Sequence, residues 1–489
     1  MDYLDPEKQR QHSILLLVGY VCVTIAVVIA TVILVYQAYG FGIDRSGTVI
    51  QNGVVFVSSQ LKSSTIYVNG VKKDQTNARL ALPADIYTLR LTRPGYIDWQ
   101  RKIEVDGGSV THFDYPFLIP KAVKTSPLAN LGAVPTLSTQ SPDRRWLLLN
   151  LAADPQNFQL YDLKNPTKPA EQLSLPAAAA TKPAAGEQWQ LAEWADDNVH
   201  VLLKHIVDGK TEFVLLNRDS PDQSVSLNQT LNADPTTITL SNKKYDQYYL
   251  YNESDHSLQT ASLRTPTPAP LLSNVLAYKT YGDNQVVFVT SSDAPTGKVL
   301  LKFLDGTKTT ELRSLPASGH YLVDYATYDG TPYLIAGATD EGKVYIYRDP
   351  IAQLAGKNQR VIVPLQVLRV PAADYESFSS NAQYVMVEHA NQIAVYDLLN
   401  KNGYNYNLAA GLDAPQPHAI WMDGNHLSYV SHSTLQILDF DQQNQHNFVA
   451  ASALATPFFA PDYKFVYTLV STSNGASLTS TSLLSPADQ

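Results

Sequence analysis

The sequence contains very little cysteine, little methionine and few charged residues. It has one cysteine, Cys22, and three methionines, and charged residues make up 17% of the chain. A single cysteine excludes an intrachain disulfide and also excludes a zinc site built from several cysteines. We therefore expect the 489 residues to fold on hydrophobic packing alone, with room for two or more domains.

Basic charge is also scarce. The formal net charge is −9 and the isoelectric point is near 5.6. Proteins that bind nucleic acid need a basic surface that faces the phosphates, so this balance argues against a nucleic-acid partner. No cluster of Lys and Arg indicates electrostatic binding to anionic lipid headgroups either.

Common catalytic motifs are absent. The chain has no H-E-x-x-H, G-x-S-x-G, G-x-x-x-x-G-K-[ST] or G-x-G-x-x-G sequence, the signatures of zinc proteases, serine hydrolases and nucleotide-binding proteins. Its 11 histidines are scattered. His426 and His432 flank one expected strand pair, but their spacing matches no metal-binding pattern. We therefore predict no catalytic residue, no metal and no cofactor, and keep a histidine metal site as the alternative.

One long apolar run is present, from Ser13 to Tyr36, and it contains no charged residue. A helix of about 24 residues spans roughly 36 Å, enough to cross a hydrocarbon core of about 30 Å. No later segment has this character. We predict a transmembrane helix at residues 13–36 that acts as an uncleaved signal anchor. A cleaved signal peptide is the alternative, although its apolar region is usually shorter and ends at small residues.

The charges beside this run favour one orientation. Lys8 and Arg10 precede it within residues 1–12, whereas no Lys or Arg follows it before Arg45. Cytoplasmic flanks carry the excess of Lys and Arg. We therefore expect residues 1–12 in the cytoplasm, the helix in the plasma membrane and the bulk of the chain on the extracytoplasmic side.

The rest of the chain has the composition of a β protein. It is rich in Tyr (29) and Pro (29), and short segments alternate apolar and polar residues as half-buried strands do. Residues 47–120 form the first such region. Within it, Asn69-Gly70 lies between IYV and VKK. This is a strong hairpin signal, because a type I′ turn needs positive φ at both central residues.

Three segments of this region carry a family resemblance: TIYVNGVKK, LALPADIYTLRLTRPGY and KIEVDGGSVTHFDYPFLIP. Their order resembles the PEGA domain, a small β-sandwich of bacterial and archaeal surface proteins. That family usually has Pro-x-Gly-x-Tyr where this chain has Pro83 to Tyr87, with Asp85 in place of the glycine. Asp tolerates the left-handed conformation better than most residues. The family has no catalytic residues, so the resemblance implies an exposed spacer or binding module.

Residues 130–489 contain a weak internal repeat of roughly 35–50 residues. Each unit contains a turn with Asp or Asn, an apolar strand, a short gap and a second strand, and clear copies begin at Ser141 and Ala195. We count about eight units, although about seven fit nearly as well. Such units cannot bury both faces alone and must stack, which favours a β-propeller. A stack of β-sandwiches is the alternative.

Two turns of this region support a propeller. Ser141-Pro142-Asp143 and Ala460-Pro461-Asp462 resemble the S-P-D-G-K turn of TolB-like and WD40-like propellers, although the glycine is missing from both. The resemblance implies a propeller of about 7–8 blades. The expected fold class is therefore mainly β, with one N-terminal transmembrane helix, a small PEGA-like β-sandwich and a β-propeller.

Aromatic residues provide the candidate partner contacts. Exposed Tyr and Trp are favoured at binding surfaces because each combines an apolar ring with a polar group. The candidates are Trp99 in the PEGA-like region and Tyr248, Tyr249, Tyr404 and Tyr406 in the repeats. The alternative for each is an ordinary strand residue that packs within its own sheet.

These features together predict a non-enzymatic binding or scaffold protein of the bacterial cell envelope. Residues 13–36 would anchor it, and the propeller would bind a protein or glycan partner. The bacterial setting comes from the resemblances alone. The alternative is an envelope enzyme that acts on glycan or peptide at the propeller channel, which would need paired carboxylates or histidines at one mouth of the channel. A signalling role is disfavoured because residues 1–12 are too few for a signalling domain.

Overall fold

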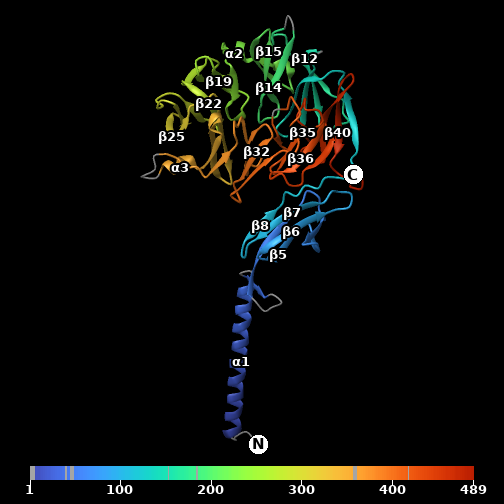
Figure 1. Cartoon of the computed structure of the whole chain (residues 1–489), viewed down its shortest axis with the longest axis vertical. Coiled ribbons are helices and arrows are strands. Elements are labelled where there is room, and N and C mark those ends of the chain that lie inside the picture. The colour runs from blue at the N-terminus through green and yellow to red at the C-terminus, as the bar shows by residue number, and fades with distance from the viewer. Residues whose placement is uncertain are drawn as a thin grey trace. The chain divides into compact units, whose positions relative to one another are not determined.

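The computed structural model describes residues 6–38, 41–43, 49–151, 154–182, 186–355, 361–416 and 418–488. Contacts within the chain divide it into two units, residues 1–122 and residues 123–489. The first unit begins with one long helix, α1 (Pro6–Ala38) (Figure 1). By length and composition, its segment Arg10–Tyr36 can cross a membrane, in agreement with the expected span.

Two four-stranded sheets make up the described β part of the first unit. One has the order β1-β2-β5, with β8 paired in parallel to β2, and the other has the order β4-β3-β6-β7. The strands are β1 (Phe41–Ile43), β2 (Val49–Val57), β3 (Thr65–Val68), β4 (Val71–Gln75), β5 (Ala78–Pro83), β6 (Asp85–Thr92), β7 (Trp99–Val105) and β8 (Val110–Phe113).

In the first unit, one expected turn has the conformation that the sequence predicts, and the segment around Asp85 does not. Asn69 and Gly70 have φ values of 48° and 78°, so the expected hairpin turn joins β3 to β4. Asp85 does not adopt a left-handed conformation and instead begins β6. The family glycine is therefore not needed at this position, because ordinary extended backbone is open to any residue.

The second unit is a β-propeller. Within its described residues, eight four-stranded sheets follow one another along the chain, here numbered blades 1 to 8. The first four blades contain β10 (Pro135–Gln140), β11 (Trp146–Leu151), β12 (Asp154–Asp162) and β13 (Glu171–Ser174); β14 (Glu187–Trp194), β15 (His200–Val207), β16 (Lys210–Asn217) and β17 (Val225–Ser226); β18 (Thr237–Leu240), β19 (Gln247–Asn252), β20 (Ser257–Ser262) and β21 (Ala269–Leu272); and β22 (Val275–Tyr281), β23 (Gln285–Thr290), β24 (Lys298–Asp305) and β25 (Lys308–Pro316).

The remaining blades have the same plan. They contain β26 (Tyr321–Tyr328), β27 (Thr331–Ala338), β28 (Lys343–Arg348) and β29 (Gln366–Arg369); β30 (Tyr375–Phe378), β31 (Tyr384–His389), β32 (Gln392–Asp397) and β33 (Asn402–Asn407); β34 (Ile420–Trp421), β35 (His426–Ser431), β36 (Thr434–Asp439) and β37 (His446–Ala450); and β38 (Phe458–Phe459), β39 (Phe465–Thr472) and β40 (Gly475–Ser482). The short helix α2 (Leu227–Leu231) connects blade 2 to blade 3, and α3 (Pro350–Leu354) lies between the third and fourth strands of blade 5.

Blade 8 is completed by a strand from the start of the unit. Strand β9 (Thr125–Asn130) pairs antiparallel with β40, so the two ends of the unit share one sheet (Figure 1). The expected start of the propeller at residue 130 leaves out all of this strand except Asn130. Closing the ring in this way removes the free sheet edges that an open array would expose.

The core of the propeller lies between neighbouring blades. One apolar cluster joins blades 8 and 1 through Leu147 and Tyr467, and a second joins blades 1 and 2 through Phe158 and Trp189. Because both faces of a blade are covered, its middle strands are almost continuously apolar, as in YVMVEH of β31. First strands of neighbouring blades contact each other, for example β22 with β26, so these strands surround the axis.

The two propeller turns that lack the expected glycine still have left-handed backbone at the glycine position. Arg144 and Tyr463, which occupy the glycine positions, have φ values of 60° and 54°. The Arg144 guanidinium lies 4.7 Å from the centre of the Tyr463 ring, and its Nη2 donates a 2.8 Å hydrogen bond to the Met422 carbonyl. These contacts between the turns offset the roughly 1–3 kcal/mol cost of left-handed backbone at non-glycine residues.

Candidate functional site

A cavity opens among the first strands of blades 2 to 5. It has a volume of about 1050 Å³ and is lined from β14, β18, β22 and β26. We call it the axial cavity. Polar and aromatic side chains line it, including Glu193, Lys279, Tyr281 and Tyr325. Concave sites of this size with a few convergent polar groups are where proteins bind ligands.

Four charged residues from four blades form what we call the axial cluster: Glu193, Lys279, Asp324 and Glu376, on β14, β22, β26 and β30. Lys279 Nζ lies 2.9 Å from Asp324 Oδ1. The Lys279 side chain is 48% exposed and that of Asp324 is 15% exposed, so the pair lies at the edge between protein and solvent. Burial lowers the pKa of Lys279, but Asp324, Glu376 and Glu193 together raise it above its ordinary value.

The two glutamates of the cluster bridge neighbouring blades. Glu376 Oε1 accepts a 3.1 Å hydrogen bond from the Val323 N–H, and Glu193 Oε2 accepts a 2.9 Å bond from the Leu240 N–H. Burial, reinforced by Asp324, raises the pKa of Glu376 to about 8. Burial also raises the pKa of Glu193. Both glutamates therefore favour the protonated form more than a carboxyl group in water does.

Tyrosines supply the aromatic part of the lining. The rings of Tyr281 and Tyr325 lie 4.8 Å apart in an edge-to-face arrangement. The hydroxyl of Tyr281 lies 2.5 Å from the Thr327 hydroxyl, and that of Tyr278 lies 3.0 Å from the Thr239 hydroxyl. The cavity thus combines apolar ring surface with hydroxyls and charged groups, which suits a polar ligand that also has apolar faces.

The raised pKa of Glu376 predicts a pH-dependent stability. Between the ordinary value of 4.5 and about 8, the unfolded chain releases a proton that the folded chain keeps. Glu376 therefore lowers stability progressively as the pH rises through this window. Glu376→Gln removes this titration, so we expect its melting temperature, relative to that of the parent chain, to increase from pH 5 to pH 8. A difference that stays constant across this range would contradict the prediction.

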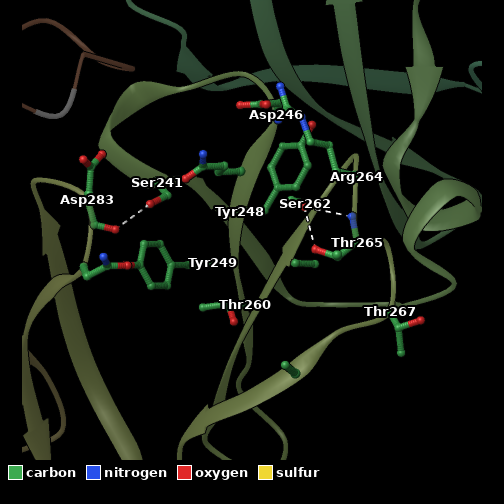
Figure 2. A pocket seen from close by; sticks show the side chains of 14 residues that line it. Ser241, Asp246, Tyr248, Tyr249, Thr260, Ser262, Arg264, Thr265, Thr267 and Asp283 are labelled. Carbon is green, nitrogen blue, oxygen red and sulfur yellow. Dashed lines mark hydrogen bonds between the residues drawn. The ribbon is translucent and has the colours of Figure 1, made fainter. Parts of the chain in front are cut away.

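Three of the five residues expected to contact a partner are buried, and that expectation is wrong for them. Trp99 is 1% exposed, and its ring packs edge-to-face on Tyr115 at 5.9 Å. Tyr248 is 1% exposed and Tyr249 is 3% exposed. Strand alternation cannot tell which face is covered, and both faces of β19 are covered here. These side chains contribute to packing, and Tyr248 and Tyr249 form the inner wall of a smaller pocket (Figure 2).

Tyr404 and Tyr406 are half-buried on β33, the fourth strand of blade 6. The Tyr406 hydroxyl donates a 3.0 Å hydrogen bond to the Phe440 carbonyl, and the Tyr404 ring packs 5.4 Å from the Phe440 ring. Because a fourth strand is farthest from the axis, neither residue belongs to the axial cavity. Their role as partner contacts stays a prediction.

Sequence reasoning missed the axial cluster. Its members lie far apart in the sequence, and none belongs to a recognisable motif. The available signal was the repeat: each member occupies the first strand of its own blade. Aligning the repeats would have assigned each of these charged residues to the first strand of its blade.

Of the two histidines that the sequence singled out, His426 lies in a buried ion-paired site and His432 lies in a turn. His426 is buried, with Nδ1 2.8 Å from Asp423 Oδ2 and Nε2 3.4 Å from Asp439 Oδ1. Burial lowers its pKa, but the two carboxylates outweigh this and raise it to about 10. His432 occupies a turn with a φ of 50°. In the described part of the chain, no group of three or more His, Cys, Asp or Glu residues is arranged to hold a metal ion.

Comparison with known proteins identifies one domain. Residues 52–119 match the family model of the PEGA domain, as the resemblance implied. No curated protein matches the chain in sequence. Similar solved structures include an oligogalacturonate lyase in complex with manganese, at 13% identity and a TM-score of 0.40, covering 74% of this chain and 98% of that one.

Two further solved structures are similar over a smaller share of this chain. The Swd1 β-propeller domain of Myceliophteria thermophila is 11% identical with a TM-score of 0.38, covering 67% of this chain and 97% of that one. Kluyveromyces lactis Hsv2 is 10% identical with a TM-score of 0.39, covering 64% and 96%. The strand order and the closure by β9 independently define the fold of this chain as a propeller.

Proposed function

We propose that this chain is a membrane-anchored binding protein whose propeller holds a protein or glycan partner of the cell envelope at the axial cavity. Residues 13–36 anchor the chain, the PEGA domain acts as a spacer or a second binding module, and the propeller lies on the extracytoplasmic side. A closed propeller provides a rigid platform, and a rigid platform lowers the entropic cost of holding a partner.

The axial cavity is the observation that carries this proposal. It brings together residues from several blades, and it combines the half-exposed Lys279 side chain, the hydroxyls of Tyr278 and Tyr281 and the ring of Tyr325. None of these groups is required to close the ring, because closure comes from β9. Polar groups that converge on a cavity at a propeller axis favour recognition of a polar partner.

The proposed topology predicts a simple protection pattern. In cells that express the chain with a C-terminal tag, protease should remove the tag once any outer wall or membrane is opened, while the plasma membrane is still intact. The positive flank at Lys8 and Arg10 is the reason, because it favours a cytoplasmic N-terminus. A tag that stays protected until the plasma membrane is broken would place the propeller in the cytoplasm and contradict the proposal.

Binding at the axial cavity can be tested with one matched pair of variants. Lys279→Gln removes one of the charges that line the cavity, whereas Lys308→Gln removes an exposed charge at the start of β25, away from the cavity lining. We expect the first change to weaken capture of the envelope partner by about tenfold, because hydrogen bonds to charged groups contribute about 1.5–3 kcal/mol. The second should leave capture unchanged. Equal capture by both variants would exclude the axial cavity.

One observation favours an enzyme as the second candidate. Burial and Asp324 raise the pKa of Glu376 to about 8, so a protonated carboxyl group lies near a carboxylate that is paired with Lys279. Glycosidic cleavage uses a protonated carboxyl group as the acid together with a carboxylate. The same capture experiment separates the two candidates: a bound glycan or peptide that is recovered intact supports binding, and a shortened one supports an enzyme.

A further inference from the structure

A second pocket lies at the edge of blade 3, next to a turn of blade 4, and is separate from the axial cavity. Its volume is about 480 Å³. Asp246, Arg264, Ser262, Thr265 and Asp283 are among the residues that line it and are labelled in Figure 2. We call it the blade 3 pocket. Its size suits a small molecule rather than a protein surface.

Two opposite charges line this pocket without pairing. Within the part of the chain that the structure describes, neither the Arg264 guanidinium nor the Asp246 carboxylate has a hydrogen-bond or ion-pair partner. The other carboxylate of the pocket is already occupied, because Asp283 accepts hydrogen bonds from Lys244 Nζ at 2.5 Å and from Asn242 Nδ2 at 3.0 Å. Asp246 and Arg264 thus remain available for a ligand.

The backbone positions of these two residues are fixed by the sheet. Gln247 and Ser262 are paired residues at the end of the β19–β20 ladder, so Asp246 is adjacent to this end and Arg264 follows it after Leu263. The Leu263 N–H donates a 3.0 Å hydrogen bond to the Asp246 carbonyl. Figure 2 shows both charged side chains at the same end of the pocket.

The turn that carries Arg264 is closed by its own hydroxyls. The Ser262 and Thr265 hydroxyls lie 2.7 Å apart, and the Thr265 N–H donates a 3.0 Å hydrogen bond to Ser262 Oγ (Figure 2). The Ser262 N–H donates a 3.1 Å bond to the Thr265 carbonyl. Three internal hydrogen bonds restrict the backbone of this turn, so less backbone entropy is lost when Arg264 binds a ligand.

We propose that the blade 3 pocket binds a small zwitterion of the amino-acid type. The ligand carboxylate would pair with the Arg264 guanidinium, whose planar fork suits a carboxylate. The ligand ammonium would pair with the Asp246 carboxylate. Asp246 and Arg264 line one pocket and do not form an ion pair with each other. One molecule that carries both charges can therefore pair with both residues at once.

Three small probes test this arrangement on the full-length chain in detergent micelles. L-alanine carries both charges, propionate carries only the carboxylate and ethylamine carries only the ammonium. Ligand-observed saturation-transfer NMR titrations measure the affinity of each. We expect L-alanine to bind about tenfold or more tightly than either single-charge probe, because hydrogen bonds between charged groups are among the strongest in proteins.

Two variants assign each charge. Arg264→Gln should weaken L-alanine and propionate about tenfold and leave ethylamine unchanged, whereas Asp246→Asn should weaken L-alanine and ethylamine and leave propionate unchanged. Arg79→Gln, at an exposed arginine in the first unit, serves as the matched control and should change nothing. L-alanine that binds no more tightly than propionate, or that is insensitive to both pocket variants, would overturn the proposal. These results do not depend on the axial cavity, so the two sites are tested separately.

Discussion

A propeller without β9 is expected not to fold. A chain that begins at Gly132 lacks the strand that completes blade 8, whereas a chain that begins at Val123 keeps it. Loss of β9 leaves one edge of β40 without its backbone partners, from Ser477 to Thr481, and opens the ring. Several backbone hydrogen bonds at about 1 kcal/mol each approach the total stability of a typical domain, which is about 5–15 kcal/mol.

This pair of chains is matched because both lack α1 and the PEGA domain and therefore require no detergent. Size-exclusion chromatography and circular dichroism should show a monomeric β protein with cooperative melting for the longer chain and aggregation for the shorter one. Residue Leu131, which is 8% exposed and donates a backbone hydrogen bond to Ala476, is lost together with β9 in the shorter chain. Equal melting temperatures for the two chains would show that closure by β9 contributes little.

Trp99→Ala is expected to unfold the PEGA domain. Trp99 is 1% exposed and packs against Tyr115, so its removal leaves a large cavity. Truncation of a buried aromatic residue costs about 3–5 kcal/mol. A domain of this size buries little surface and has little stability to lose, so the change should remove most of the amide protection in β6 and β7. Hydrogen exchange of the full-length chain, read by mass spectrometry, measures this locally.

Ile86→Ala is the control for that experiment. The Ile86 side chain is 51% exposed in the same domain, so its truncation should change stability by less than about 0.5 kcal/mol. Propeller peptides should keep their protection in both variants, because they belong to the other unit. Normal protection of β6 and β7 in Trp99→Ala would restore the surface role that the sequence suggested for Trp99.

The local features of this protein were readable from the sequence. The run from Ser13 to Tyr36 predicted a long apolar helix because hydrophobic length is a property of contiguous residues. Asn69-Gly70 predicted a hairpin because the turn geometry depends on the two residues that form it. The repeats predicted a propeller, because a unit of four short strands needs neighbours to cover its faces. The PEGA domain was recognised by resemblance, from three segments and their order.

Features that depend on distant residues were decided only by the tertiary structure. The fourth strand of blade 8 is β9, whose partner β40 lies at the other end of the unit. The axial cluster exists because four first strands surround one axis, and its glutamates have raised pKa values only because the packed blades bury them. Packing between blades also buries Tyr248 and Tyr249, which the strand sequence did not predict. A strand sequence shows which residues alternate, but only the packed neighbours determine which faces remain open to water.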